Sequence, residues 1–293
     1  MFLVTGATGD IGKRVVRRLR KEDVPVRSFV RLSSRYGELE HRGSEIFIGD
    51  LREQRDIDKA CQGVKYIISA HGSGGDALAL DYRANIELID RAKDIGVEHF
   101  AFISVLGADR GYEDAPVFKA KREVEKYLSS SGLNYTILRP AGLSSNLLPL
   151  AERFQQTGIY LLVGDRQSRT SIISTDDLAL MAVDSISNAD ARNQIFAVGG
   201  PEVLKREDIP QIFGRVYHRE PVIINPPLAV VDGLRTAIGL FNADAQKAIG
   251  TFRTLLDNEF FCTPAEIERL ESVFKIKLET LESFIRRYAG TTD

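Results

Sequence analysis

The chain opens with Phe2-Leu-Val-Thr-Gly-Ala-Thr-Gly-Asp-Ile-Gly12, in which Gly6, Gly9 and Gly12 are spaced three residues apart. A short apolar run precedes the glycines, and an amphipathic run over residues 11–19 follows them. A strand, a glycine turn and a helix in this order suit a pyrophosphate. The glycines allow close approach of the backbone, and the N–H groups and dipole of the helix N-terminus face the phosphates.

The spacing is not the common G-x-G-x-x-G, so the prediction depends on the position of the glycines directly after a first strand. The alternative is that they only form a tight turn between strand and helix. Six residues of the turn and the helix start are expected to bind the cofactor: Gly6, Thr8, Gly9, Asp10, Ile11 and Gly12.

Beyond this turn, short β-branched or aromatic runs alternate with helical patterns. The expected strands are Val26–Val30, Glu45–Ile48, Tyr66–Ala70, Phe100–Ser104 and Tyr135–Leu138. The expected helices cover residues 56–61, 77–95 and 118–130. Near-continuous apolar strands with intervening helices predict an α/β fold with a doubly wound, Rossmann-like parallel sheet.

The alternation becomes looser after about residue 145. Four short strands are expected there, at Ile159–Val163, Ser171–Ile173, Gln194–Val198 and Val222–Ile224, and residues 228–288 read as mostly helical. We therefore expect a dinucleotide-binding core over residues 1–145. Residues 146–293 would hold the interleaved remainder of that core and a smaller, partly helical C-terminal lobe that binds a substrate or a partner.

Two apolar stripes at helical spacing occur in this C-terminal half. The first is Leu228, Val231, Leu234, Ile238 and Phe241, and the second is Leu278, Leu281, Ile285 and Tyr288. The first could dock on a membrane surface or a partner helix, although packing on its own domain is the more common role of such a stripe. We expect the second to pack back as a terminal helix.

Composition excludes several classes of function. The 293 residues carry a net charge of −2, and the basic residues over 13–21 read as a solvated helix face, so we expect no nucleic-acid partner. The two cysteines and four histidines show no metal spacing and no disulfide framework, which indicates no metal site and a reducing compartment, cytoplasmic or stromal. We expect neither a signal peptide nor a transmembrane segment.

The strand ends indicate which dinucleotide binds. The second strand closes with Arg31, followed by Arg35, and no carboxylate occurs before Glu38. An NAD-specific fold places a carboxylate here for the ribose 2′-hydroxyl, whereas arginines pair with the 2′-phosphate of NADP. NADP is therefore expected over NAD.

Two more strand ends contribute expected cofactor contacts. Asp50 and Leu51 follow the third strand, and the aspartate can either accept the adenine amino group or cap the next helix. Ala70, His71 and Gly72 end the fourth strand. Pro140, which ends the strand after residue 135, is expected to pass the nicotinamide end.

Several motifs resemble the NmrA-like branch of the atypical short-chain dehydrogenases/reductases over nearly the whole chain. They are Thr5-Gly-Ala-Thr-Gly-Asp-Ile-Gly12, Gly96-Val-Glu-His-Phe100, Lys121-Arg-Glu-Val-Glu125, Ser131-Gly-Leu-Asn-Tyr-Thr-Ile-Leu-Arg-Pro140, Thr175-Asp-Asp-Leu178 and Val198-Gly-Gly-Pro-Glu202. The branch includes quinone reductases, isoflavone-type reductases, vinyl-chlorophyllide reductases and redox-sensing regulators. The sequence is most similar to its photosynthetic group, the assembly factors of cyanobacteria and chloroplasts.

The resemblance implies a catalytic set of Ser, Tyr and Lys, and this chain keeps two of the three. Ser104 stands at the position of the family's serine and Lys121 at that of its lysine, where the lysine also holds the nicotinamide ribose. Val117 replaces the tyrosine, and Tyr112 lies only in the preceding loop. Alternatively, Ser104 is a strand-end serine with a local hydrogen bond, and Lys121 lies on a charged helix face.

Two functions follow from these expectations. The first is an NADP-dependent oxidoreductase acting on a quinone, an enone or a similar conjugated small molecule, with Ser104 orienting the oxygen and Lys121, or a water it positions, supplying the proton. The second is a catalytically silent NADP-binding assembly factor or redox sensor for a protein complex of the photosynthetic apparatus, with peripheral contact to a membrane. Val117 favours the second.

Overall fold

The computed structural model describes residues 1–72, 76–112, 115–226 and 254–289. The chain divides into two units. Unit 1 comprises Met1–Arg139, Thr175–Phe196 and Ser272–Lys275, and unit 2 comprises Pro140–Ser174, Ala197–Glu271 and Ile276–Asp293. The first apolar stripe, from Leu228 to Phe241, lies outside the described residues.

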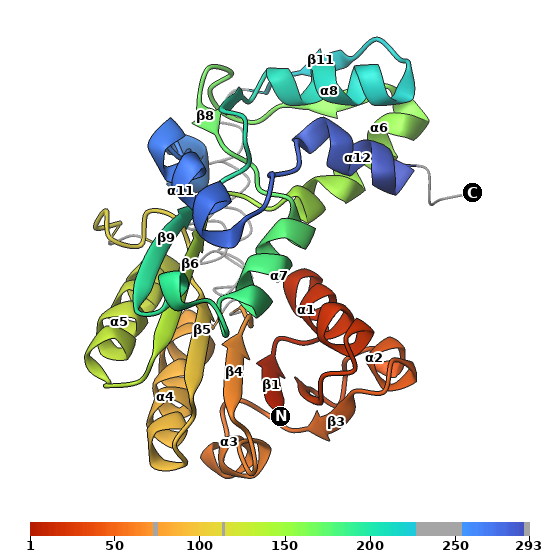
Figure 1. Ribbon diagram of the computed structural model, residues 1–293. Helices are drawn as coiled ribbons and strands as arrows, with labels where there is room; N and C mark the ends of the chain where they lie inside the picture. The colour runs from red at the N-terminus through yellow and green to blue at the C-terminus, as the bar shows by residue number, and fades with distance from the viewer. Residues whose placement is uncertain (73–75, 113–114, 227–253, 290–293) are drawn as a thin grey trace, which may run out of the picture. The chain divides into compact units, whose positions relative to one another are not determined.

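A seven-stranded sheet in the order β3-β2-β1-β4-β5-β6-β9 organises the molecule (Figure 1). Its strands are β1 (Phe2–Thr5), β2 (Val26–Val30), β3 (Glu45–Ile48), β4 (Tyr66–Ser69), β5 (His99–Ile103), β6 (Tyr135–Pro140) and β9 (Gln194–Val198). The first six strands pair in parallel. β1 lies between β2 and β4, so the strand order reverses at β1, and a ligand crevice is expected at the carboxyl ends of the strands there.

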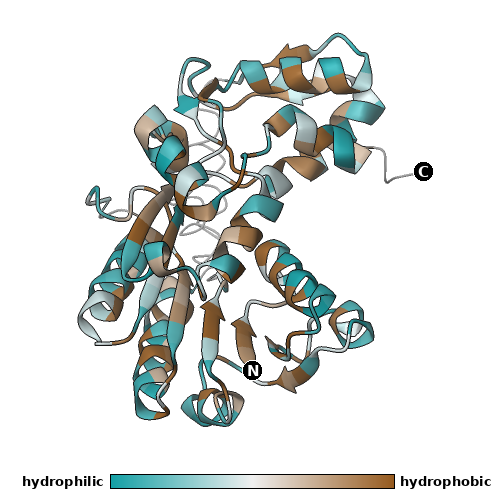
Figure 2. Cartoon of the chain, viewed as in Figure 1, coloured by the Kyte–Doolittle hydropathy of each residue, from teal (hydrophilic) through white to brown (hydrophobic). Residues whose placement is uncertain are grey.

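Helices connect these strands and cover the sheet (Figure 1). They are α1 (Asp10–Lys21), α2 (Gly37–His41), α3 (Gln54–Ala60), the π-helix η1 (Ala77–Arg83), α4 (Ala84–Asp94), α5 (Pro116–Ser130), α7 (Thr175–Asp184) and the short η3 (Ala189–Ala191). Residues of α3, α4 and α5 share one apolar cluster with the strands, built on side chains such as Leu88, Phe100 and Val124. Figure 2 shows the alternation of brown apolar and teal charged residues on these helices. The prediction of a Rossmann-like α/β fold is confirmed.

Unit 2 contains smaller elements. They are η2 (Ser144–Leu147), α6 (Leu148–Thr157), β7 (Ile159–Leu161), β8 (Arg169–Thr170), β10 (Leu204–Lys205), α8 (Asp208–Tyr217), β11 (Val222–Ile224), α11 (Pro264–Phe274), whose residues from Ser272 onward are assigned to unit 1, and α12 (Leu281–Ala289). β8 pairs with β10 and β7 with β11. Three residues of the second apolar stripe pack as a terminal helix as expected, because Leu281, Ile285 and Tyr288 of α12 join a cluster with Phe154 and Phe213. The fourth, Leu278, is buried but lies before α12 begins.

Two expected elements differ from the structure. The single helix expected over 77–95 is a π-helix followed by an α-helix, because its first turns follow the wider i→i+5 pattern. The strand expected at Ser171–Ile173 lies two residues earlier, at β8, and Ile173 makes only an isolated bridge with Leu143.

Candidate cofactor site

The glycine turn after β1 lies directly against the backbone of residues 70 and 71. Gly6 has a φ of 66°, and a Cβ there would lie 2.6 Å from the carbonyl oxygen of Ala70 and from the backbone nitrogen of His71. A Cβ at Gly12 would lie 2.2 Å from the Gly6 oxygen. Only glycine fits both positions without a shift of the backbone, so the turn is built for close approach.

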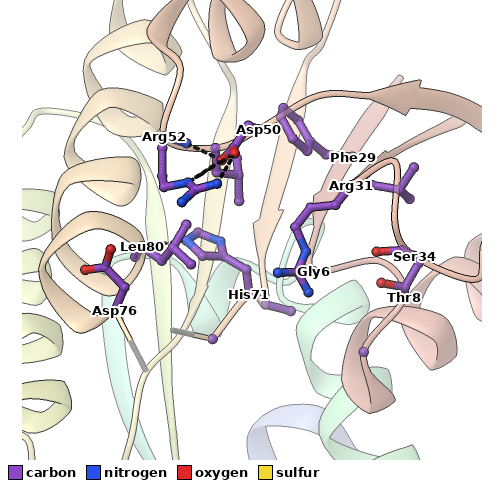
Figure 3. A pocket seen from close by; sticks show the side chains of 15 residues that line it. Gly6, Thr8, Phe29, Arg31, Ser34, Asp50, Arg52, His71, Asp76 and Leu80 are labelled. Carbon is purple, nitrogen blue, oxygen red and sulfur yellow. Dashed lines mark hydrogen bonds and ion pairs between the residues drawn. The ribbon is translucent and has the colours of Figure 1, made fainter. Parts of the chain in front are cut away.

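A cleft of about 490 Å³ opens beside this turn, at the carboxyl ends of β1, β2, β3 and β4 (Figure 3). Nine of the residues expected at the cofactor line it: Gly6, Thr8, Gly9, Arg31, Asp50, Leu51, Ala70, His71 and Gly72. The others do not line it: Asp10, Ile11, Gly12, Arg35, Lys121 and Pro140. Ile11 and Gly12 are buried in α1, where they hold the turn in place.

The wall formed by the end of β2 is cationic. Arg31 and Ser34 line the cleft, and both side chains are labelled in Figure 3. Glu38, the first carboxylate after β2, is held by Arg17 at 3.1 Å and Arg42 at 3.1 Å, and the hydrogen bond from Arg17 lowers its pKa. Glu38 does not line the cleft, so this wall offers a guanidinium group and no carboxylate for a ribose hydroxyl pair.

Arg52 lines the cleft as well, although it was not among the residues expected at the cofactor. Its Nε and Nη2 donate to the Asp50 carboxylate at 3.0 and 2.5 Å, and this hydrogen bonding lowers the pKa of Asp50. Asp50 therefore caps no N–H of α3; instead, its own backbone N–H donates to Asp56 at 3.0 Å. Figure 3 shows Arg52 and Arg31 reaching the cleft from two different strand ends.

His71 is the centre of a buried hydrogen-bond network beneath the cleft. Its Nε2 lies 2.9 Å from the Leu80 carbonyl oxygen, which can only accept, so Nε2 carries the proton. Its Nδ1 lies 2.8 Å from the Thr5 hydroxyl, which donates. Ser69 donates to Asn85 at 2.6 Å. Burial and the charge of Lys121 lower the pKa of His71 to about 4, so the ring is neutral at neutral pH and ties β1 and β4 to η1.

Lys121 lies inside the protein. Its side chain, on α5, is 9 % exposed, and Nζ donates to the Ile103 carbonyl oxygen at 2.9 Å. Nζ also lies 3.4 Å from Oδ1 of Asp81 in η1, whose side chain is 1 % exposed. Neither carboxylate oxygen of Asp81 accepts a hydrogen bond from a described residue. The lysine thus forms a buried ion pair and keeps donor capacity beyond the Ile103 bond.

Ser104 also hydrogen-bonds to another side chain of the protein. Its hydroxyl donates to Glu125, and Arg139 binds the same carboxylate through Nε at 3.0 Å and Nη2 at 2.5 Å. A hydroxyl has one proton to donate, so Ser104 can accept from a ligand in this arrangement but cannot also donate to one. Val117, at the family's tyrosine position, offers no polar atom, and the Tyr112 ring packs edge-on against Phe118 at 5.2 Å.

Comparisons with a protein-family model, with related proteins and with solved structures all indicate a dinucleotide-binding protein. The NAD(P)H-binding family model matches residues 6–189. The chain is a member of the NAD(P)H-binding family. Its resemblance to the NmrA-like atypical short-chain reductases is therefore confirmed, and so is the expected class of cofactor.

Relatives in this family have different roles. The chain is 31% identical to an NAD(P)H azoreductase of Xenophilus azovorans, with 71% of each covered. It is 27% identical to the photosystem II assembly factor Ycf39 of Cyanophora paradoxa, over 98% of this chain and 91% of that one. Among solved structures, the NADPH complex of the Escherichia coli quinone oxidoreductase QOR2 is similar, with a TM-score of 0.75, 21% identity and coverage of 99% and 100%. That last likeness shows the fold.

The residues of the cleft fit a dinucleotide. The turn at Gly6 exposes backbone to a pyrophosphate, and Arg31 and Arg52 supply positive charge. In the described ranges, no group of three or more His, Cys, Asp or Glu residues is placed to hold a metal ion. No helix of that part of the chain is long and apolar enough to cross a membrane.

Proposed function

We propose that this chain binds NADPH in the unit 1 cleft and reduces a quinone or another conjugated carbonyl compound. The observation that carries the proposal is that one cleft combines two features. Its turn at Gly6 has no room for a Cβ atom, and Arg31 and Arg52 lie on its wall. The relationship to an azoreductase supports a reductive activity. When bound, the cofactor supplies a hydride.

The state of the proton-transfer residues supports this class of acceptor. Val117 replaces the phenol, the proton of Ser104 is directed to Glu125, and Lys121 is paired with Asp81. A substrate whose oxygen becomes strongly basic on reduction needs a protein acid. A quinone makes a weaker demand, because the oxygen of its reduced form is phenolate-like, with a pKa near 10, so a proton held by Lys121 or by a water beside it suffices.

In this proposal Ser104 keeps its hydrogen bond to Glu125 and Lys121 keeps its ion pair with Asp81 while they contact a ligand. Ser104 accepts a hydrogen bond from a hydroxyl of the cofactor or substrate, and Lys121 uses a remaining N–H to hold an oxygen. Lys121 would then supply a proton directly or through a water. The free, buried state of Cys61 and Cys262 supports a reducing location, cytoplasmic or stromal.

The second candidate is an NADPH-binding assembly factor or redox sensor that performs no turnover. The observation favouring it is that Ser104 and Lys121 both donate hydrogen bonds to other residues of the protein. Together with Val117 at the tyrosine position, they do not form the Ser, Tyr and Lys set of an ordinary short-chain reductase. The near full-length match to the assembly factor of Cyanophora paradoxa supports it as well. Its partner would be a protein complex, with peripheral contact to a membrane.

An acceptor assay separates the two candidates. Wild-type chain loaded with NADPH is tested with a naphthoquinone, an azo dye and an enone while NADPH absorbance is followed. The proposal expects oxidation that depends on the acceptor. It further expects that Lys121→Met lowers kcat at least tenfold and changes the NADPH Kd less than threefold.

Lys126→Met is the matched control, because it removes an exposed lysine of the same helix, whose ion pair among the described residues is with Glu123. It should leave both kcat and Kd unchanged. Tight NADPH binding without turnover of any acceptor would reject the reductase and support the assembly factor or sensor.

A further inference from the structure

Unit 2 contains a second cavity, of about 440 Å³ and mostly apolar. Its walls come from residues between 141 and 150, from 160–163, from residues between 169 and 172, from Arg206 and Ile209, and from residues between 255 and 260. All of its described lining residues belong to unit 2. A cavity of this size and character, with few polar groups, is typical of a site for a small organic ligand.

Arg206 is the exceptional side chain in this cavity. Its Nη1 and Nη2 donate to the carbonyl oxygens of Leu256 and Leu255 at 2.8 and 2.6 Å, which uses two of its five N–H donors. Gly164 makes room for it, since a Cβ there would lie 2.5 Å from Nη1. Arg206 forms no ion pair with any described residue, and burial lowers its pKa although Asp165 and Asp257 lie within electrostatic reach.

Arg169, the other arginine that lines the cavity, has its charge balanced by a carboxylate. Arg169 binds the Glu259 carboxylate through Nε at 2.9 Å and Nη2 at 2.7 Å and stacks over the Phe261 ring at 4.2 Å. Arg169 therefore has a carboxylate in direct contact, whereas Arg206 has Asp165 and Asp257 within electrostatic reach but no direct ion pair with a described residue. A half-buried cation among apolar side chains is unfavourable without an anion beside it.

Tyr160 adds a second donor. It lines the same cavity, is 7 % exposed, and its ring packs on Phe213 at 5.7 Å. Its hydroxyl makes no hydrogen bond with a described residue, and burial raises its pKa to about 12, so it stays protonated. Tyr160 and Arg206 both line this cavity, so their donor groups are available to one ligand within it.

We propose that this cavity binds a flat apolar molecule that carries a carboxylate, with Arg206 and Tyr160 as the two donors to that carboxylate. The aromatic or aliphatic body would fill the apolar part, and the carboxylate would give Arg206 the direct ion pair that no described residue gives it. The inference concerns unit 2 alone and needs neither NADPH nor turnover, so it stands or fails separately from the proposed function.

The test uses the full chain and two matched probes, 2-naphthoate and 2-naphthamide, which differ in charge but hardly in shape. Naphthalene fluorescence can be followed directly, because the chain contains no tryptophan. We expect wild type to bind the carboxylate at least tenfold more tightly than the amide. Arg206→Leu should remove that preference, and Tyr160→Phe should weaken carboxylate binding three- to tenfold.

Lys205→Leu is the control, since it removes the neighbouring cation, which is exposed and outside the cavity. It should bind both probes as wild type does. The proposal is overturned if wild type binds the amide as tightly as the carboxylate, or if a folded Arg206→Leu keeps the preference. If Arg206→Leu does not fold, an unchanged carboxylate affinity in Tyr160→Phe rejects the proposal.

Discussion

Arg52 holds the Asp50 carboxylate with two of its nitrogen atoms and sits with Arg31 on the wall of the cofactor cleft. These three side chains together carry one net positive charge. Arg52→Leu removes that charge and also frees the Asp50 carboxylate, so both effects disfavour a 2′-phosphate. We expect NADPH affinity to fall about tenfold or more, as for loss of a charge-assisted contact, and NADH affinity to fall less.

Isothermal titration of both cofactors measures this, with Arg55→Leu as control. Arg55 is 76 % exposed and lies three residues further along the chain, outside the cleft lining. The Asp50→Asn, Arg52→Leu double variant should recover part of the lost NADPH affinity, because it removes the freed carboxylate. Equal losses for NADPH and NADH in Arg52→Leu would contradict an interaction with the 2′-phosphate.

The sequence predicts the hydrogen-bond and ion-pair partners of some site residues but not of others. The Asp50–Arg52 pair lies two residues apart, so a carboxylate followed by an arginine was an available signal. The partners of Ser104 and Lys121 were not predictable, because Glu125 reaches Ser104 from 21 residues away and Asp81 reaches Lys121 from 40 residues away. Such pairings depend on how strands and helices are packed. The roles of Ser104 and Lys121 stay predictions.

At the scale of elements, the turn between β1 and α1 offers a selective test. A Cβ at Gly9 would meet only the Gly6 oxygen, at 3.2 Å, so Gly9→Val leaves the fold largely intact while placing bulk in the cleft. We expect dinucleotide binding to be lost in titration, with an unchanged circular dichroism spectrum. Gly37→Ala, where a Cβ meets nothing within 4 Å, is the control and should bind as wild type does. Wild-type affinity in Gly9→Val would refute the site.

The elements themselves were predictable where local pattern and packing agree. The strands β2, β3, β9 and β11 begin and end where the apolar runs indicate. At least one regular face of β2 and β9 is mostly buried, whereas β3 and β11 are intermediate or exposed, so the run of β-branched and aromatic residues alone indicates their bounds. The π-helix was not predictable, since hydrophobic periodicity over 77–95 does not distinguish i→i+5 from i→i+4 bonding. The basic face of α1 is only partly solvated, because Arg14 pairs with Asp176 of α7 at 2.9 Å.

For the whole molecule, two buried histidines predict a loss of stability in acid. Burial lowers the pKa values of His71 and His99 to about 4 in the folded state, below the ordinary 6.5. The unfolded chain therefore binds more protons between these values. Stability is retained above about pH 6.5 and is lost as the pH falls toward 4, by up to roughly 3 kcal/mol for each histidine.

Urea unfolding at pH 7.0 and pH 5.0 measures this loss. The double variant His71→Gln, His99→Gln should be less stable at pH 7 but should show a flatter pH dependence. His41→Gln removes an exposed histidine of α2 and should keep the wild-type slope. An unchanged slope in the double variant would show that other groups cause the acid sensitivity.

The central claim is that the unit 1 cleft binds NADPH through its glycine turn and its arginine wall. Titration of the wild-type chain with NADPH and NADH, alongside Arg31→Ala, tests it most directly. We predict that wild type binds NADPH at least tenfold more tightly than NADH and that Arg31→Ala removes most of this difference by weakening NADPH binding alone. Equal affinity of wild type for the two cofactors, or no binding of either, would contradict the account.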